Sequence, residues 1–346
     1  MDFSQHTSPH ISGSNQVSKV MLEVLIAMIP GIMAMGWYFG SGVIYNLVIA
    51  VVTALAAEAV MLRLRDRPIK PHLLDLSAVV TAVLIALSLP PLLPWWVTVI
   101  GTAFAIVVGK HLYGGLGFNP FNPAMVGYVL LLITFPVEMT IWLPTYFMQT
   151  YTLGPLDTAA YVFFGQLPTG ITIDALAGAT PLDEMKTQLA QNITISEIRS
   201  SPLWGDFGGQ GWEWIGNWFG LGGLWLVYRK IITWHIPVAV LGSLLAIAMV
   251  FYLIDSDSHP FALFHVFSGG AILCAFFIAT DPVSAATSNL GKIYFGIGIG
   301  LLIYIIRSWG GYPDGVAFAV LLMNMAAPMI DYYTKPKAFG HHGRSS

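Results

Sequence analysis

The sequence predicts an all-α polytopic membrane protein of about ten transmembrane helices, arranged as two inverted five-helix repeats. Of its 346 residues, 56% are hydrophobic and only 10% are charged, whereas about 25% of residues are charged in soluble domains. Apolar windows recur at about 20 residues, the length needed to cross about 30 Å of hydrocarbon. Five windows precede a long polar stretch and five follow it, and an odd number per half inverts the second half.

The predicted spans divide the chain into five parts. The first membrane repeat covers residues 20–143, with windows at 20–38, 42–62, 72–90, 95–110 and 121–143. The second covers residues 215–333, with windows at 215–230, 235–254, 261–280, 291–307 and 315–333. Residues 144–214 form a polar loop between them, and residues 1–19 and 334–346 form polar tails. The first tail lacks the basic region and short apolar core of a signal peptide.

Glycine and proline interrupt the hydrophobic sequence at matching places in the two repeats. Leu89-Pro90-Pro91 ends the third window and Gly114-Gly115 follows the fourth, while Asp281-Pro282 ends the eighth and Gly310-Gly311 follows the ninth. Such interruptions in corresponding positions predict broken helices around a site near the middle of the membrane. They also favour an internal duplication of the chain.

The basic residues predict the orientation, because Lys and Arg accumulate on the cytoplasmic side of short loops. With ten spans and a cytoplasmic N-terminus, 12 of the 15 basic residues are cytoplasmic: Lys19, Arg63, Arg65, Arg67, Lys70, Lys110, Arg229, Lys230, Lys292, Lys335, Lys337 and Arg344. Both tails are then cytoplasmic, and the 144–214 loop is periplasmic in a multi-pass protein of a bacterial inner membrane. That loop carries seven carboxylates and two basic residues.

Ionisable and polar residues within the spans are candidates for an ion path, because charge in hydrocarbon is costly. Glu58 lies about one turn from Arg63 and is expected to pair with it. Asp281 precedes a proline at a span end, where a carboxylate can bind a cation or a backbone amide. Asn122 lies in a run of Gly, Pro and Asn that either lines a site or starts a helix, with Asn122 as N-cap and Pro123 at the first position.

Other classes of site are not predicted. No His, Cys, Asp and Glu grouping has metal-site spacing, and no residue is assigned a catalytic role. The single cysteine, Cys274, lies in an apolar run and is expected to be buried. The net charge of −3 gives no indication of a nucleic-acid partner, whereas the composition makes membrane lipid an obligatory one.

The most distinctive water-facing stretch begins at Asp174 and reads Asp-Ala-Leu-Ala-Gly-Ala-Thr-Pro-Leu-Asp. Thr180, Pro181 and Asp183 have the pattern of a helix start, with Thr180 as N-cap. The same geometry suits a phosphate, because the first helical turn offers free N–H donors and the positive end of the dipole. The stretch therefore fits either a simple cap or an attachment site.

This stretch resembles the signature Asp-(Gly/Ala)-x-Ser-Gly-Ala-Thr, at which a flavin transferase joins FMN to the threonine through a phosphodiester. The one departure is Ala177, where Ser is usual. The chain as a whole resembles the D subunits of Rnf (also called Rsx) electron-transport complexes, which are related to the B subunit of the sodium-pumping NADH:quinone reductase. Ser-Pro-His near the N-terminus, the run from Gly114 to Ala124, Thr-Asp-Pro-Val-Ser-Ala from Thr280 and Tyr-Arg-Lys from Tyr228 carry this resemblance.

The resemblance implies a urea-transporter-like fold and an electron-transfer role. FMN would be bound covalently through Thr180, with Asp174, Gly178 and Ala179 completing the attachment motif, and a noncovalent riboflavin is also implied. The implied partners are the other Rnf subunits (A, B, C, E and G) and, during maturation, the flavin transferase. The complex would couple electron transfer between NADH and ferredoxin, or another low-potential acceptor, to Na⁺ or H⁺ translocation.

Two other functions fit parts of the sequence. A passive channel or solute carrier would also use an inverted repeat, and Asn122-Pro123-Ala124 matches the pore tripeptide of aquaporins, although those channels need two copies. A structural scaffold in a larger complex is the other alternative. Neither accounts for the flavin-attachment motif.

Overall fold

The computed structural model describes residues 17–335, and this part of the chain is helical without a named strand. The first half contains α1 (Val17–Phe39), α2 (Gly42–Leu64), α3 (Ile69–Leu73), α4 (Ser77–Leu87), α5 (Trp95–Phe104), η1 (Ala105–His111), α6 (Pro123–Thr134) and α7 (Pro136–Thr140). The connecting loop contains η2 (Tyr146–Met148), α8 (Pro155–Phe164), α9 (Ile173–Leu176), α10 (Pro181–Ala190) and α11 (Ile195–Ile198). The second half contains α12 (Trp212–Tyr228), α13 (His235–Ile254), α14 (Ala262–Phe267), α15 (Ala271–Leu273), η3 (Cys274–Ile278), α16 (Asn289–Trp309) and α17 (Val316–Thr334). Most of the two predicted tails, including Ser-Pro-His, lies outside the described residues.

Within residues 17–335, five helices are long and apolar enough to cross a membrane, namely α1, α2, α13, α16 and α17. The other predicted spans are shorter or interrupted. The window at 72–90 contains only the 11 residues of α4 as apolar helix, which extend about 16 Å and cannot cross about 30 Å alone. The window at 261–280 is divided among α14, α15 and η3. Helix α4 stops just before Leu89-Pro90-Pro91, and η3 stops just before Asp281-Pro282, as the broken-helix prediction requires.

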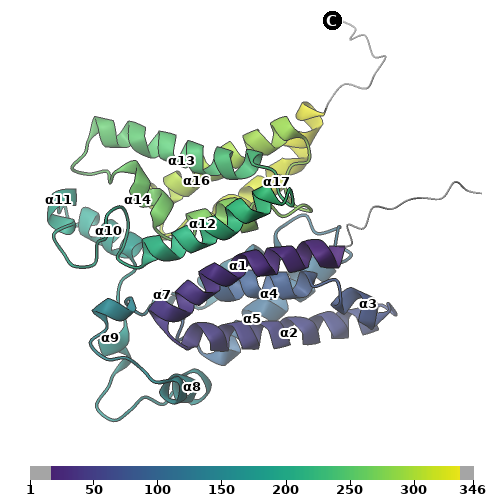
Figure 1. The fold of residues 1–346 in the computed structure, drawn as a ribbon, viewed down its shortest axis with the longest axis horizontal. Helices are drawn as coiled ribbons and strands as arrows, with labels where there is room; N and C mark the ends of the chain where they lie inside the picture. Colours follow the sequence, from purple (N-terminus) through teal and green to yellow (C-terminus); the bar gives the residue numbers. More distant parts are fainter. Residues whose placement is uncertain (1–16, 336–346) are drawn as a thin grey trace, which may run out of the picture.

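The first helices of the two halves pack against each other in antiparallel directions (Figure 1). Glu23 near the start of α1 forms an ion pair with Arg229, just after the end of α12. At the opposite end, the rings of Phe39 and Trp212 lie 5.0 Å apart. The fifth helices, α6 and α17, also pack on each other. Pairing of equivalent helices in opposite directions is the arrangement that an inverted repeat produces.

The internal plan of each half repeats in further detail. Leu76 before α4 and Gly269 before α15 both adopt the left-handed conformation, with φ of 63° and 64°. A buried basic residue lies near the end of the fourth helix of each half and bonds the neighbour of this left-handed residue. Lys110 donates to Ser77 Oγ, and Arg307 donates to Ser268 O. The two cations therefore occupy equivalent positions at opposite ends of the molecule.

Different segments of the chain gather at the two ends of the molecule. The described chain starts and finishes at one end, on the right of Figure 1, where the basic residues flanking α2, α12 and α16 also gather. The loop helices α8 to α11 gather at the other end, on the left. We refer to these as the inner and outer ends, after the orientation predicted from the basic residues.

Candidate functional site

Thr180 is the N-cap of α10, as the sequence predicts. Its Oγ1 accepts a hydrogen bond from the backbone N–H of Asp183 at 3.2 Å, and Pro181 occupies the first helical position. Proline fits there because that position has no intrahelical N–H bond to lose. Thr180 is partly exposed at the outer end.

Contacts on both sides hold this segment in place. Before Thr180, the N–H of Gly178 donates to Trp142 O at 2.8 Å. Six residues after it, Lys186 Nζ donates to the carbonyl oxygens of Tyr312, at 2.9 Å, and Gly310. Burial lowers the pKa of the Lys186 ammonium, an effect partly opposed by Asp183. Thr180 is therefore fixed relative to the membrane helices.

The remaining residues of the attachment motif lie at the surface nearby. Asp174 is exposed in the first turn of α9, and Ala179 is exposed beside Thr180. Gly178 is partly buried against Pro144, where an added Cβ would come within 3.3 Å of the ring. The motif thus presents two accessible residues and one that permits close packing.

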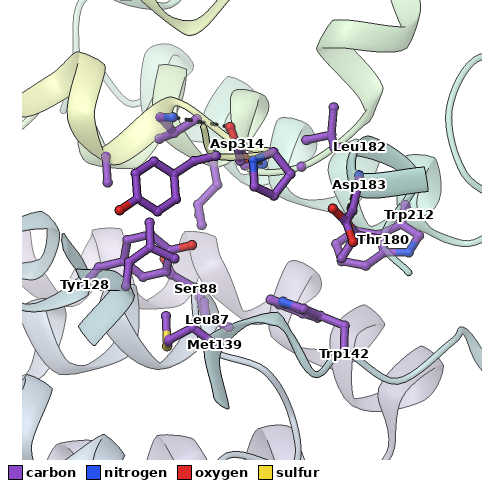
Figure 2. A pocket seen from close by; sticks show the side chains of 18 of the residues that line it. Leu87, Ser88, Tyr128, Met139, Trp142, Thr180, Leu182, Asp183, Trp212 and Asp314 are labelled. Carbon is purple, nitrogen blue, oxygen red and sulfur yellow. Dashed lines mark hydrogen bonds between the residues drawn. The ribbon is translucent and has the colours of Figure 1, made fainter. Parts of the chain in front are cut away.

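A cavity lies beside Thr180 and is lined by residues from both halves of the chain (Figure 2). Its walls are mainly aromatic and aliphatic, with Tyr128, Met139, Trp142 and Trp212 among them. The rings of Trp142 and Trp212 lie 5.3 Å apart. Thr180, Asp183 and Asp314 provide polar groups, and Met125 and Ile278 also line the cavity.

The polar wall of this outer cavity is stabilised by an ion pair that sequence inspection missed. Asp314 Oδ1 lies 3.1 Å from the guanidinium of Arg307, whose side chain is 2% exposed. Asp314 Oδ2 accepts from the N–H of Gly270 at 2.9 Å. Arg307 also donates to the carbonyl oxygens of His265 and Ser268. A single Arg near a span end was the only available signal, and its partner follows in the next loop.

The outer cavity and α10 suit a flavin nucleotide attached at Thr180. Aromatic and aliphatic walls with a few polar groups are typical of sites for planar organic cofactors. The N-terminus of a ten-residue helix favours a phosphate attached to its cap. Asp183 and Glu184 in the first turn oppose that attraction with negative charge. The shape and chemistry of the walls therefore carry the fit more than electrostatics does.

A second cavity lies toward the inner end, and several charged and amide side chains line it. Its lining includes Ser77, Lys110, Asn119, Asn122, Asp281 and Lys292. Asp281 Oδ2 accepts from Ser284 Oγ at 2.8 Å. Asn119 is 4% exposed, and its Oδ1 has no hydrogen-bond partner among the described residues. The structure therefore brings two predicted ion-path residues, Asn122 and Asp281, to one cavity.

Hydrogen bonds from three amide groups join the walls of the two cavities. Asn122 caps α6, as predicted, and its Nδ2 donates to Ile278 O at the end of η3 at 3.1 Å. The N–H of Asn122 donates to Asn324 Oδ1 at 3.0 Å, and Asn324 Nδ2 donates to Ser284 O at 3.0 Å. Ile278 lines the outer cavity, whereas Asn122 lines the inner one. We call this contact the septum, and Asn324, a lone amide in an apolar helix, was not predicted.

The prediction that Glu58 pairs with Arg63 is wrong. Glu58 instead lies 2.7 Å from Lys110 Nζ and 3.1 Å from His111 Nε2, with all three side chains 2% exposed. Residues five apart on a helix do not share a face, unlike residues three or four apart. Arg63 is exposed while Glu58 faces the interior. Lys110 also bonds Ser77 Oγ, so Glu58 belongs to a buried cluster beside the inner cavity.

Comparisons with known proteins point in one direction. Residues 4–340 match the family described as NQR2, RnfD, RnfE. The chain is 51% identical to the D subunit of the ion-translocating oxidoreductase complex of Aeromonas hydrophila, over 98% of this chain and 99% of that protein. It is 52% identical to the protein of the same name from Ectopseudomonas mendocina, over 98% and 96% of the two chains. The corresponding protein of Salmonella paratyphi B is 48% identical over 99% of both.

Proposed function

This chain belongs to the NQR2, RnfD, RnfE family, and we propose that it acts as the flavin-carrying D subunit, within the membrane, of an ion-translocating oxidoreductase complex. Its similarity to the D subunits of such complexes extends over nearly the whole length of each chain. Its helices are those of a multi-pass membrane protein. Its partners are accordingly the other subunits of such a complex, which we infer to be A, B, C, E and G, in a bacterial inner membrane.

The proposed cofactor is FMN, joined through its phosphate to Thr180. The observation that supports this most directly is the position of the Thr180 hydroxyl, at the N-terminus of α10 and beside the aromatic outer cavity. Asp174 and Ala179 are exposed for recognition by a flavin transferase. Trp142 and Trp212 would line the site of the flavin ring. When bound, FMN supplies the redox chemistry, while the protein supplies position and surroundings.

The proposed reaction couples electron transfer between NADH and ferredoxin, or another low-potential acceptor, to ion movement. Thr180 lies at the end away from the cytoplasmic basic residues, so electrons must cross the membrane through partner subunits to reach it. Each elementary charge that crosses couples to the membrane potential at about 2.3 kcal/mol per 100 mV. A second, noncovalent flavin, riboflavin, is part of the proposal and can be sought in the supernatant of the denatured complex.

The proposed ion path for Na⁺ or H⁺ uses Asp281, Asn122 and Glu58. Two of these line the inner cavity, and Glu58 holds Lys110 in its wall. Asp281→Asn keeps the size of the side chain but removes its charge. We expect this variant to move fewer ions per electron in proteoliposomes while retaining its flavin. An unchanged ratio would remove Asp281 from the path.

Flavin attachment can be tested with variants that separate the hydroxyl of Thr180 from its capping role. Thr180→Ala removes both, whereas Thr180→Asn keeps a good N-cap and removes only the hydroxyl. Thr194, which bonds Glu197 ahead of α11, offers a control in Thr194→Ala. We expect in-gel flavin fluorescence of the denatured protein to vanish in both Thr180 variants and to persist in the control.

The same experiment separates the proposal from the alternatives. Fluorescence that survives Thr180→Asn would place the flavin elsewhere. A passive channel or carrier predicts a colourless wild-type protein. Mass spectrometry of the peptide containing Thr180 identifies the adduct directly.

A further inference from the structure

Helix α8 in the outer loop exposes an apolar face where a water-facing helix would be polar. Leu156 and Phe164 are 84% and 78% exposed, and Phe163 is 41% exposed. These residues share one side of the helix with Ala160, since residues three and four apart lie together. The opposite side is also apolar or small, with Thr158 and Val162 buried against the protein.

The position of α8 shows what its free face meets. Tyr45 Oη, in the first turn of α2, donates to Pro155 O at 3.0 Å, and its ring lies 6.2 Å from that of Phe163. Helix α8 thus packs on the outer end of a membrane-crossing helix. Further along that helix, Val48 and Val52 are 56% and 62% exposed, forming its lipid-facing side.

The direction of α8 fits a helix lying in the plane of the membrane surface. In Figure 1, α1 and α2 run across the picture, whereas α8, at the lower left, is seen nearly along its axis. A short helix perpendicular to the spans, with an exposed apolar face beside the outer end of α2, has the geometry of an interfacial helix. Tyr45 supplies an aromatic group of the kind enriched at this level of a bilayer.

We propose that α8 is a membrane-surface helix whose Leu156, Phe163 and Phe164 insert between the lipids of the outer leaflet. It would brace the outer end of α2 and anchor the start of the loop that leads to Thr180. The occupant of its free face is lipid, because Phe163 packs on Tyr45 of α2, and the exposed apolar side of that membrane-crossing helix includes Val48, one turn further along. A helix from a neighbouring protein of the complex would compete for the same face.

The test uses the full chain within its complex, reconstituted in phosphatidylcholine nanodiscs. An environment-sensitive fluorescent amino acid is placed at position 164, at position 156, or at Gln166, which is exposed just beyond the helix. Quenching by a doxyl-labelled phosphatidylcholine is compared with quenching by iodide in water. We expect the lipid quencher to act several-fold more strongly at 164 and 156 than at 166, with the order reversed for iodide.

Two results would overturn the proposal. Strong iodide quenching at both 164 and 156 would place the face in water. Protection from both quenchers would show that a neighbouring protein of the complex covers it. Using two positions on one face guards against a variant that fails to fold.

Discussion

Glu58 and Glu23 each pair with a cation from a distant part of the chain, but only the first pair is buried. Glu58 and Lys110 are both 2% exposed, whereas Arg229, the partner of Glu23, is 42% exposed. Removing one member of a buried pair leaves an uncompensated charge in a low-dielectric interior, whereas an exposed pair is screened by water. Their contributions to stability should therefore differ sharply.

Glu58→Gln is expected to destabilise the protein by about 3–5 kcal/mol, because it leaves Lys110 charged and buried. Glu23→Gln is the matched control and should cost less than about 1 kcal/mol. Adding Lys110→Met to Glu58→Gln should recover part of the loss. Thermal unfolding of the purified protein in detergent measures all three, and equal effects of the two single variants would contradict the burial argument.

Residue-level predictions from sequence succeeded where the interaction was local. Thr180 and Asn122 are N-caps because each is followed at once by proline and a helical segment, all visible within a few residues. The partner of Glu58 is 52 residues away, and the septum joins Asn122 to a residue 202 positions later. No spacing pattern encodes such pairs, so the septum and the Lys110 contact emerged only from the fold.

At the scale of helices, the contact between α1 and α12 depends on a glycine. A Cβ added at Gly222 would lie 1.8 Å from Ala27 O, a separation that two packed helices cannot accommodate. A Cβ added at Gly242 on α13 would have no neighbouring atom within 4 Å. One glycine is required by packing and the other is not.

Gly222→Ala should push α1 and α12 apart and destabilise the protein by about 1–3 kcal/mol. Gly242→Ala should be neutral or stabilise its helix by up to about 1 kcal/mol. The melting temperatures of the two variants in the same detergent give the comparison. A stable Gly222→Ala protein would mean that the helices separate without loss of other contacts.

Helix α10 depends on Lys186 for its attachment to the loop after α16. Lys186→Met removes hydrogen bonds to two carbonyl oxygens, and bonds from charged donors contribute about 1.5–3 kcal/mol each before screening. Because Lys186 is partly exposed, we expect a smaller net loss, seen as faster hydrogen exchange across residues 181–190. The exposed neighbour Thr187, changed to Ala, is the control and should leave exchange nearly unchanged.

Hydropathy predicted the existence and order of the helical segments better than their lengths. A window average counts apolar residues without indicating where the backbone stops being helical, so 72–90 was expected as a span although its apolar helix covers only Ser77–Leu87. The local signals for the breaks, Leu89-Pro90-Pro91 and Asp281-Pro282, were nevertheless informative. Proline lacks the N–H that would continue a helix, so those positions marked the ends of α4 and η3.

For the whole molecule, the duplication joins features that look unrelated in sequence. Lys110 and Arg307 share no motif, yet each lies near the end of the fourth helix of its half and bonds a serine within the third predicted span, Ser77 or Ser268. Inversion places one cluster beside the inner cavity and the other beside the outer cavity, with the septum between them. Equivalent pairs at opposite ends of the molecule are what an inverted repeat produces.

The orientation of this assembly determines which cavity faces the cytoplasm, and cysteine labelling can establish it. The only native cysteine, Cys274, is 0% exposed and should remain unlabelled in folded protein. Ala190→Cys reports on the outer loop and Lys70→Cys on the inner one, and both positions are exposed.

The basic residues near Lys70 predict a cytoplasmic location for it. A membrane-impermeant maleimide added to intact spheroplasts should therefore label position 190 and reach position 70 only after lysis. The reverse pattern would invert the molecule, place Thr180 in the cytoplasm, and remove the need for electrons to cross the membrane to reach it.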